Sequence, residues 1–98
     1  MAEIAYSERA LRDLERLTDF LMEQDALLAA DTIPLITSAV VVLENHPLIG
    51  RPVRGGHREL MISRGSTGYV ALYRYLETND HVFILGIRHQ REAGVIDP

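Results

Sequence analysis

The sequence contains no cysteine. It can therefore form no disulfide, no thiolate nucleophile and no zinc site built from Cys. Lysine is absent as well, since all ten basic residues are Arg. The flat guanidinium group suits fixed, bidentate contacts with carboxylates, whereas a Lys ammonium acts as a mobile point charge.

The first residues lack the basic segment followed by an apolar segment that marks a secretion signal. The longest unbroken apolar runs, such as Ala39–Leu43, are much shorter than a helix that spans a bilayer. We therefore expect a cytoplasmic protein with no membrane partner. Its 98 residues, of which 47% are hydrophobic and 24% charged, predict a single globular domain over residues 1–98.

Positive charge is scarce in the first half of the chain. Residues 1–50 hold three Arg and nine acids, whereas residues 51–98 hold seven Arg and five acids, within a formal net charge of −4. Proteins that bind nucleic acids gain much of their affinity from phosphate contacts and usually carry net positive charge. We therefore expect a protein as the main partner, and no direct nucleic acid contact unless the chain is a nuclease.

The spacing of apolar residues predicts one strand, two helices and three further strands, in that order. Ser7 is a natural N-cap for a first helix that runs to about Gln24, and Asp25 can cap a second helix that ends at Asn45. The expected strands are Ala2–Tyr6, Arg58–Ser63, Tyr69–Glu77 and Val82–His89, with a surface loop over His46–Gly56. The fold class is therefore α+β: an N-terminal strand and a two-helix hairpin packed on a C-terminal, three-stranded antiparallel meander.

Pro34 stands inside the second expected helix. A proline there removes one backbone hydrogen bond and clashes with the preceding turn. We expect a kink or break between Asp31 and Pro34, with Asp31 or Thr32 as the cap of the second part.

Three kinds of chemistry were weighed against the residues present. The four His show no metal-binding spacing, and no GxSxG nucleophile elbow occurs, so we expect neither a metal nor any other cofactor. Acid–base cleavage of RNA stays open, because one sheet face can gather His and Arg side chains. The pair that would carry it is His89, as acid–base group, and Arg91, as phosphate-binding group.

Recognition of another protein is the third possibility. The second helix is apolar around nearly its whole circumference, which is more than a two-layer domain of this size can bury. An apolar groove beside the acidic first helix suits an amphipathic partner helix that carries Arg. The residues expected to form or border this groove are Leu17, Leu21, Ile33, Ile36 and Val40.

Four segments in the second half of the chain carry a family resemblance: Asn45–Pro52 (NHPLIGRP), Arg58–Leu60 (REL), Gly68–Arg74 (GYVALYR) and Ile87–Gly94 (IRHQREAG). In this order and at this spacing they resemble the RelE/ParE toxin superfamily, and most of all its ParE or plasmid-stabilisation branch. The resemblance covers essentially the whole chain and implies the α+β fold described above.

The two branches imply different activities. RelE-like members are ribosome-dependent messenger-RNA endonucleases that use Lys and Arg of the central strands and a C-terminal Arg with a nearby Tyr. ParE-like members share the fold without that set and inhibit DNA gyrase. This chain has Val70 where the RelE pattern has Arg after Gly-Tyr, no Lys in Glu59–Ser63, and no Tyr after Tyr75. Losing one such electrostatic group typically costs about 100-fold or more in rate.

The resemblance therefore implies a ParE-like toxin that binds DNA gyrase and is neutralised by a cognate antitoxin, which commonly has a ribbon-helix-helix domain. The alternatives are a RelE-like endoribonuclease and a homologue without toxicity that only binds its antitoxin. The residues expected at the target surface are Arg58, Tyr73, Arg74, Arg88, His89 and Arg91.

Overall fold

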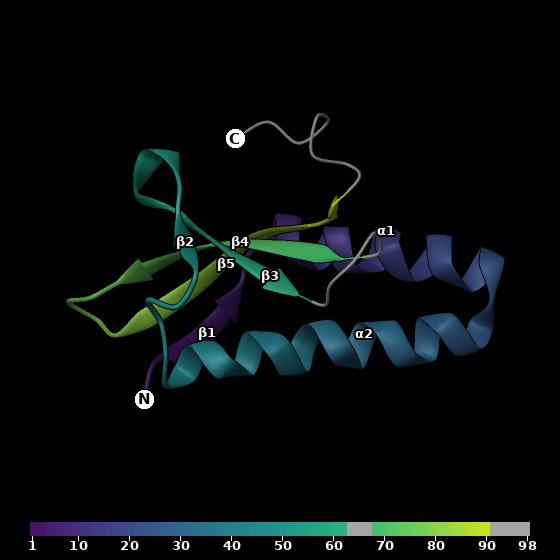
Figure 1. The fold of residues 1–98 in the computed structure, drawn as a ribbon, viewed down its shortest axis with the longest axis horizontal. Helices are drawn as coiled ribbons and strands as arrows, with labels where there is room; N and C mark the ends of the chain where they lie inside the picture. The colour runs from purple at the N-terminus through teal and green to yellow at the C-terminus, as the bar shows by residue number, and fades with distance from the viewer. Residues whose placement is uncertain (63–67, 91–98) are drawn as a thin grey trace.

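The computed structural model describes residues 1–62 and 68–90, and in them the predicted α+β class and element order are confirmed. Two helices, α1 (Glu8–Gln24) and α2 (Ala26–Val41), form an antiparallel hairpin packed on a five-stranded sheet (Figure 1). The end of the hairpin where the helices meet extends beyond the strands (Figure 1). The remaining elements are β1 (Glu3–Tyr6), the 3-10 turns η1 (Val42–Glu44) and η2 (Arg54–Gly56), β2 (Arg51–Pro52), β3 (Arg58–Ile62), β4 (Tyr69–Leu76) and β5 (His81–His89).

The sheet has the order β1-β5-β4-β3-β2. Strands β2 to β5 are antiparallel neighbours, whereas β1 lies parallel to β5, with Tyr6 opposite Ile84. The sheet is therefore mixed. Strand β2 was missed, because its two residues lie in a segment rich in Pro and Gly that indicates only a loop.

The helix caps follow the sequence prediction. The Ser7 hydroxyl accepts a hydrogen bond from the backbone N–H of Ala10 at 3.0 Å, and the Asp25 carboxylate accepts one from Leu27 at 2.9 Å. Each cap satisfies a backbone donor that the first turn of a helix leaves without a partner. Polar side chains at these two positions thus define where both helices begin.

Of the kink or break predicted at Pro34, the break is wrong, because α2 runs without interruption through this residue. Thr32, proposed as a new cap, is instead buried within the helix. Pro34 and Ala30, whose carbonyl loses its usual donor, are both exposed, so water can satisfy that carbonyl. Packing of α2 against the sheet outweighs the local cost of the proline.

The segment Ala26–Glu44, which consists of α2 and η1, is 19 residues long and has a mean hydropathy of 2.0. By length and composition alone it is enough to cross a membrane, so the prediction that every apolar segment is too short is corrected. A core helix of a folded domain passes the same test, and Ile36, Val40 and Leu43 of this segment are buried in the core.

Tyr73 of β4 fixes the loop between η1 and β2. Its fully buried hydroxyl donates to the carbonyl of Pro47 and accepts the N–H of Gly50, both at 2.8 Å. A Cβ atom on Gly50 would lie 2.5 Å from that hydroxyl, so only glycine fits. The guanidinium of Arg58 adds hydrogen bonds to the carbonyls of Leu48 and Gly50 at 3.0 and 2.8 Å.

We expect Tyr73→Phe to lower the free energy of unfolding by about 1–3 kcal/mol, because it leaves the buried N–H of Gly50 without an acceptor. Burial raises the pKa of Tyr73 above its ordinary value of 10.0, so this stabilisation is complete at neutral pH and is lost only in strong alkali. Urea unfolding at pH 7 measures the difference. Tyr75→Phe, which removes an exposed hydroxyl bonded to Asp80, is the control and should cost much less.

Candidate functional site

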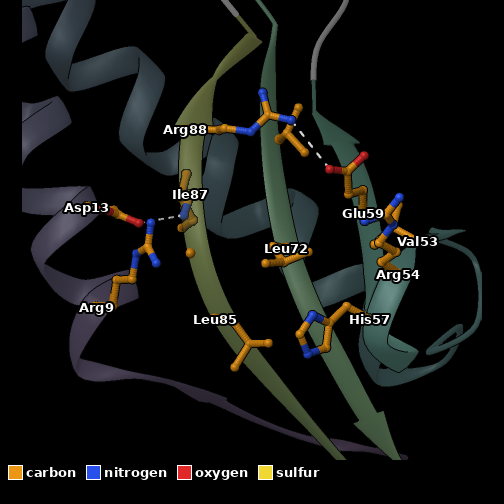
Figure 2. A pocket seen from close by; sticks show the side chains of 12 residues that line it. Arg9, Asp13, Val53, Arg54, His57, Glu59, Leu72, Leu85, Ile87 and Arg88 are labelled. Carbon is orange, nitrogen blue, oxygen red and sulfur yellow. Dashed lines mark hydrogen bonds and ion pairs between the residues drawn. The ribbon is translucent and has the colours of Figure 1, made fainter. Parts of the chain in front are cut away.

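A groove of about 380 Å³ lies on the open face of the sheet, between the first turns of α1 and the segment around η2 (Figure 2). Its floor is aliphatic and is made by Val70, Leu72 and Leu85 of β4 and β5. Arg9 and Asp13 of α1 stand on one side, and Val53, Arg54 and His57 on the other (Figure 2). Glu59 and Arg88, on β3 and β5, lie at one end.

The α1 wall is held in place by the edge of β5. Strand β1 accompanies β5 only as far as Ile84, and beyond that point α1 supplies the partners. The Ser7 backbone N–H donates to the carbonyl of Ile84 at 2.9 Å, and the Ser7 hydroxyl donates to that of Leu85 at 3.2 Å. The Asp13 carboxylate accepts the N–H of Ile87 at 2.9 Å (Figure 2).

An irregularity in β5 makes room for Asp13. Leu72 pairs with Gly86 while Tyr73 pairs with Ile84, so Leu85 is an extra residue that bulges out of the ladder. A Cβ on Gly86 would lie 3.2 Å from the Asp13 carboxylate, which is tighter than side chains normally pack. Glycine at this position therefore lets a helix side chain approach the strand backbone.

The charges at the other end of the groove compensate one another. Glu59 binds Arg51 at 2.6 Å through one carboxylate oxygen and Arg88 at 3.4 Å through the other. Both Glu59 and Arg88 are largely buried, with side-chain exposures of 15% and 16%. In a partly dry site this ion pair fixes the two side chains against the sheet.

The residues predicted for the target surface are only partly brought together. Arg88 lines the groove, but Arg58 and Tyr73 are tied to the loop at Pro47–Gly50, and Arg74 is exposed outside the groove lining. His89 stacks edge-on against Tyr69, with ring centroids 5.2 Å apart, among the core-facing residues of the sheet. Arg91 lies outside the described residues.

The predicted partner groove is corrected. Leu17, Leu21, Ile36 and Val40 are at most 5% exposed, and Ile33 is half-buried. Leu17, Ile36 and Val40 belong to the core between the helices and the sheet, and Ile33 packs against it. Helical periodicity identified the apolar face correctly but could not tell a covered face from an open one. The apolar side chains that α2 does expose are Leu27, Leu28, Leu35 and Val41.

Sequence reasoning missed the groove residues Arg9, Asp13, Arg54 and His57. Asp13 follows Ala10 by three residues and precedes Leu17 by four, which places it beside the buried face of its helix. An acid beside the buried face of a helix, together with a glycine inside a strand, was the sequence signal that could have indicated this contact. Nothing local in the sequence marked Arg54 or His57.

A sequence model of the ParE toxin of type II toxin–antitoxin systems (parDE) matches residues 4–94. The chain belongs to the ParE toxin family. This confirms the resemblance drawn from the four sequence segments, and the chain is a type II toxin of the ParE/RelE group.

Two relatives from Caulobacter vibrioides are named Toxin RelE1 and Toxin RelE3. The first is 39% identical over 79 residues, covering 81% of this chain and 85% of the relative, and the second is 37% identical over 92 residues, covering 94% and 98%. Both relatives carry the name RelE, while the matching family model is that of ParE. Sequence similarity therefore establishes the group and leaves the activity open.

Solved structures share the fold. A chain of the chromosomal ParDE system of P. aeruginosa superposes with a TM-score of 0.76 at 22% identity, covering 91% of this chain and 96% of that one. A chain of the RelBE2 toxin–antitoxin complex of Mycobacterium tuberculosis gives 0.61 at 28% identity, covering 91% and 98%. The architecture is thus common to both branches.

We predict that Asp13→Ala lowers the free energy of unfolding by about 1–3 kcal/mol, because the N–H of Ile87 loses its acceptor. The same change should speed hydrogen exchange at the Ile87 amide, whereas Asp13→Asn keeps an acceptor oxygen and should restore part of the protection. Asp19→Ala, which alters an exposed acid on the same helix, is the control. Unchanged exchange at Ile87 would contradict the role given to Asp13.

Proposed function

We propose that this chain is a toxin that acts by binding a protein, DNA gyrase, and that a cognate antitoxin neutralises it. The observation that carries the choice of mechanism is the position of His89, the acid–base group expected for RNA cleavage. Arg88 lies in the groove on the open face, while His89 lies against Tyr69 on the core side. Successive residues of a strand point to opposite faces, so His89 is turned away from the groove and cannot act as an acid–base group there. Arg91, its expected phosphate-binding partner, lies outside the described residues.

Charge supports the same choice. The chain as a whole has a net charge of −4. A ribosome-dependent nuclease must approach a polyanion, for which positive charge supplies much of the affinity. A protein target makes no such demand. Either target also implies action in the cytoplasm.

The runner-up is a RelE-like, ribosome-dependent endoribonuclease. Two observations favour it: the relatives named RelE and the presence of His57 in the same groove as Arg9, Arg54 and Arg88. If the chain cleaves RNA, His57 is the described residue best placed for acid–base work, in place of the predicted His89. A third alternative is a chain that has lost toxicity and only binds its antitoxin.

We infer an antitoxin partner because the RelBE2 relative was solved as a toxin–antitoxin complex. On this chain the exposed apolar residues Leu28, Leu35 and Val42 are spaced by seven, so they lie on one line along the helical segment. From residue 17 to residue 50 the chain contains five acids and no Arg or Lys. An amphipathic, basic antitoxin segment fits this surface, and we keep the ribbon-helix-helix type as part of the proposal.

In purified assays, the wild-type chain should inhibit DNA supercoiling by gyrase and leave messenger RNA on translating ribosomes uncut. His57→Ala is the diagnostic variant, because removing a general acid–base group costs about 100- to 10,000-fold in rate. Message cleavage that His57→Ala abolishes, with gyrase untouched, would replace our proposal by the nuclease. If neither gyrase inhibition nor message cleavage is detected, the third alternative is favoured: a chain that has lost toxicity and only binds its antitoxin.

For the antitoxin surface, we expect Leu35→Arg to weaken binding of the antitoxin encoded in the adjacent reading frame by about tenfold or more, because it puts a charge on an apolar contact line facing a basic partner. Ala30→Arg is the matched control, since it adds the same charge at an exposed position of the same helix. Calorimetric titration measures both, with thermal melts to confirm folding. Equal losses in the two variants would place the contact elsewhere.

A further inference from the structure

Basic side chains stand on both walls of the groove without a hydrogen-bond or ion-pair partner among the described residues. Arg9, on the α1 wall, and Arg54 and His57, on the η2 wall, have no hydrogen bond or ion pair with any other residue of 1–62 or 68–90. The acids of the groove are already occupied. Asp13 binds the N–H of Ile87 and lies 3.8 Å from Arg16, and Glu59 holds Arg51 and Arg88.

This excess is unusual for the molecule as a whole. The chain carries a net charge of −4, and its helical hairpin beyond Arg16 is acidic. The groove therefore presents a positive, concave surface on an otherwise negative protein. Such a surface attracts an anionic partner and orients it before contact.

The floor of the groove indicates which anion fits. Its side chains are aliphatic, from Val70, Leu72 and Leu85, and the described residues of the lining include no Phe, Tyr or Trp. Sites for single-stranded RNA combine positive charge with aromatic rings on which the bases stack, and this stacking is worth about 1–3 kcal/mol per base. An aliphatic floor lacks this contribution, but it suits the apolar side chain of a peptide. The volume of about 380 Å³ lies within the range of about 300–1,000 Å³ typical of binding pockets.

We propose that this groove is the target-binding site of the toxin and that it takes an acidic, apolar peptide segment of the target protein. Carboxylates of the segment pair with Arg9 on one wall and Arg54 on the other, and an apolar side chain between them rests on Leu72 and Leu85 (Figure 2). This inference rests on the proposed protein-binding function, because it names the surface and the chemistry of the partner.

The groove can be tested without gyrase. The probes are a short peptide of alternating Leu and Glu with blocked ends, the same peptide with Lys in place of Glu, and a single-stranded oligoribonucleotide. The acidic peptide should shift the methyl NMR signals of Val70, Leu72 and Leu85, and its binding should weaken as salt is raised. Preferential binding of the RNA, or no shift at these methyls with the acidic peptide, would overturn the proposal.

Matched substitutions then locate the charge. Arg9→Ala and Arg54→Ala should each weaken the acidic peptide by about tenfold, since each removes one charge-assisted contact. Arg12→Ala, on the same helix as Arg9 but outside the groove and paired with Glu8, should bind like the wild type. Both groove arginines are exposed, so their removal is expected to leave the fold intact, which circular dichroism verifies. Equal effects of all three changes would show a nonspecific charge effect and overturn the site.

The gyrase assay distinguishes a failure of the groove proposal from a failure of the proposed function on which it rests. If the wild-type chain inhibits supercoiling and the double variant Arg9→Ala, Arg54→Ala inhibits equally well, the groove proposal fails while the function stands. If the wild-type chain leaves gyrase untouched, the proposed target fails, and the peptide titration still decides what the groove binds. A loss of inhibition in the double variant but not in Arg12→Ala supports both.

Discussion

The free edge of β5 is the constraint on which the rest of the structure depends. Strand β1 is only four residues long and pairs with β5 no further than Ile84, so the backbone beyond needs another partner. Helix α1 supplies it through Ser7 and Asp13. An unpaired N–H buried at this edge would cost about as much as a lost hydrogen bond. The helix must therefore follow the strand edge closely, and this brings Arg9 to the rim of the open face.

The bulge at Leu85 links this edge to the chemistry of the open face. Because one residue is added, Gly86 comes to lie beside Asp13, and the residues after it keep a fixed alternation. Arg88 then reaches Glu59 on the open face, while His89 meets Tyr69 on the other. Arg88 and His89 are adjacent in the sequence and suggest a single site, but the register of β5 places them on opposite faces of the sheet. The face on which a basic side chain of this chain lies thus depends on strand register as well as on residue type.

Local signals in the sequence predicted the elements well, because caps and periodicity depend on neighbouring residues. The caps Ser7 and Asp25 act over a few residues, and the helices that they begin were predicted within a few residues of their observed ends. Pro34 and Leu17 were misjudged because their outcome depends on packing against the sheet, which no local pattern records. The groove was missed for the same reason, since Arg9, Arg54 and Arg88 come from three separate elements.

The uneven distribution of charge along the sequence corresponds to different surfaces of the fold, which the net charge of the chain does not reveal. Acidic and apolar residues gather on the hairpin, where the part of the chain from residue 17 to residue 50 has no Arg. Arg9 and Arg54, which have no ion-pair partner among the described residues, border a groove on the opposite face of the sheet. Surfaces of opposite charge select partners of opposite charge, since juxtaposed like charges are strongly unfavourable. A basic antitoxin segment on the hairpin and an acidic target segment in the groove would then not compete for the same contacts. Neutralisation must in that case come from bulk that the antitoxin places across the groove, or from a shift of α1 that moves Arg9 away from the rim.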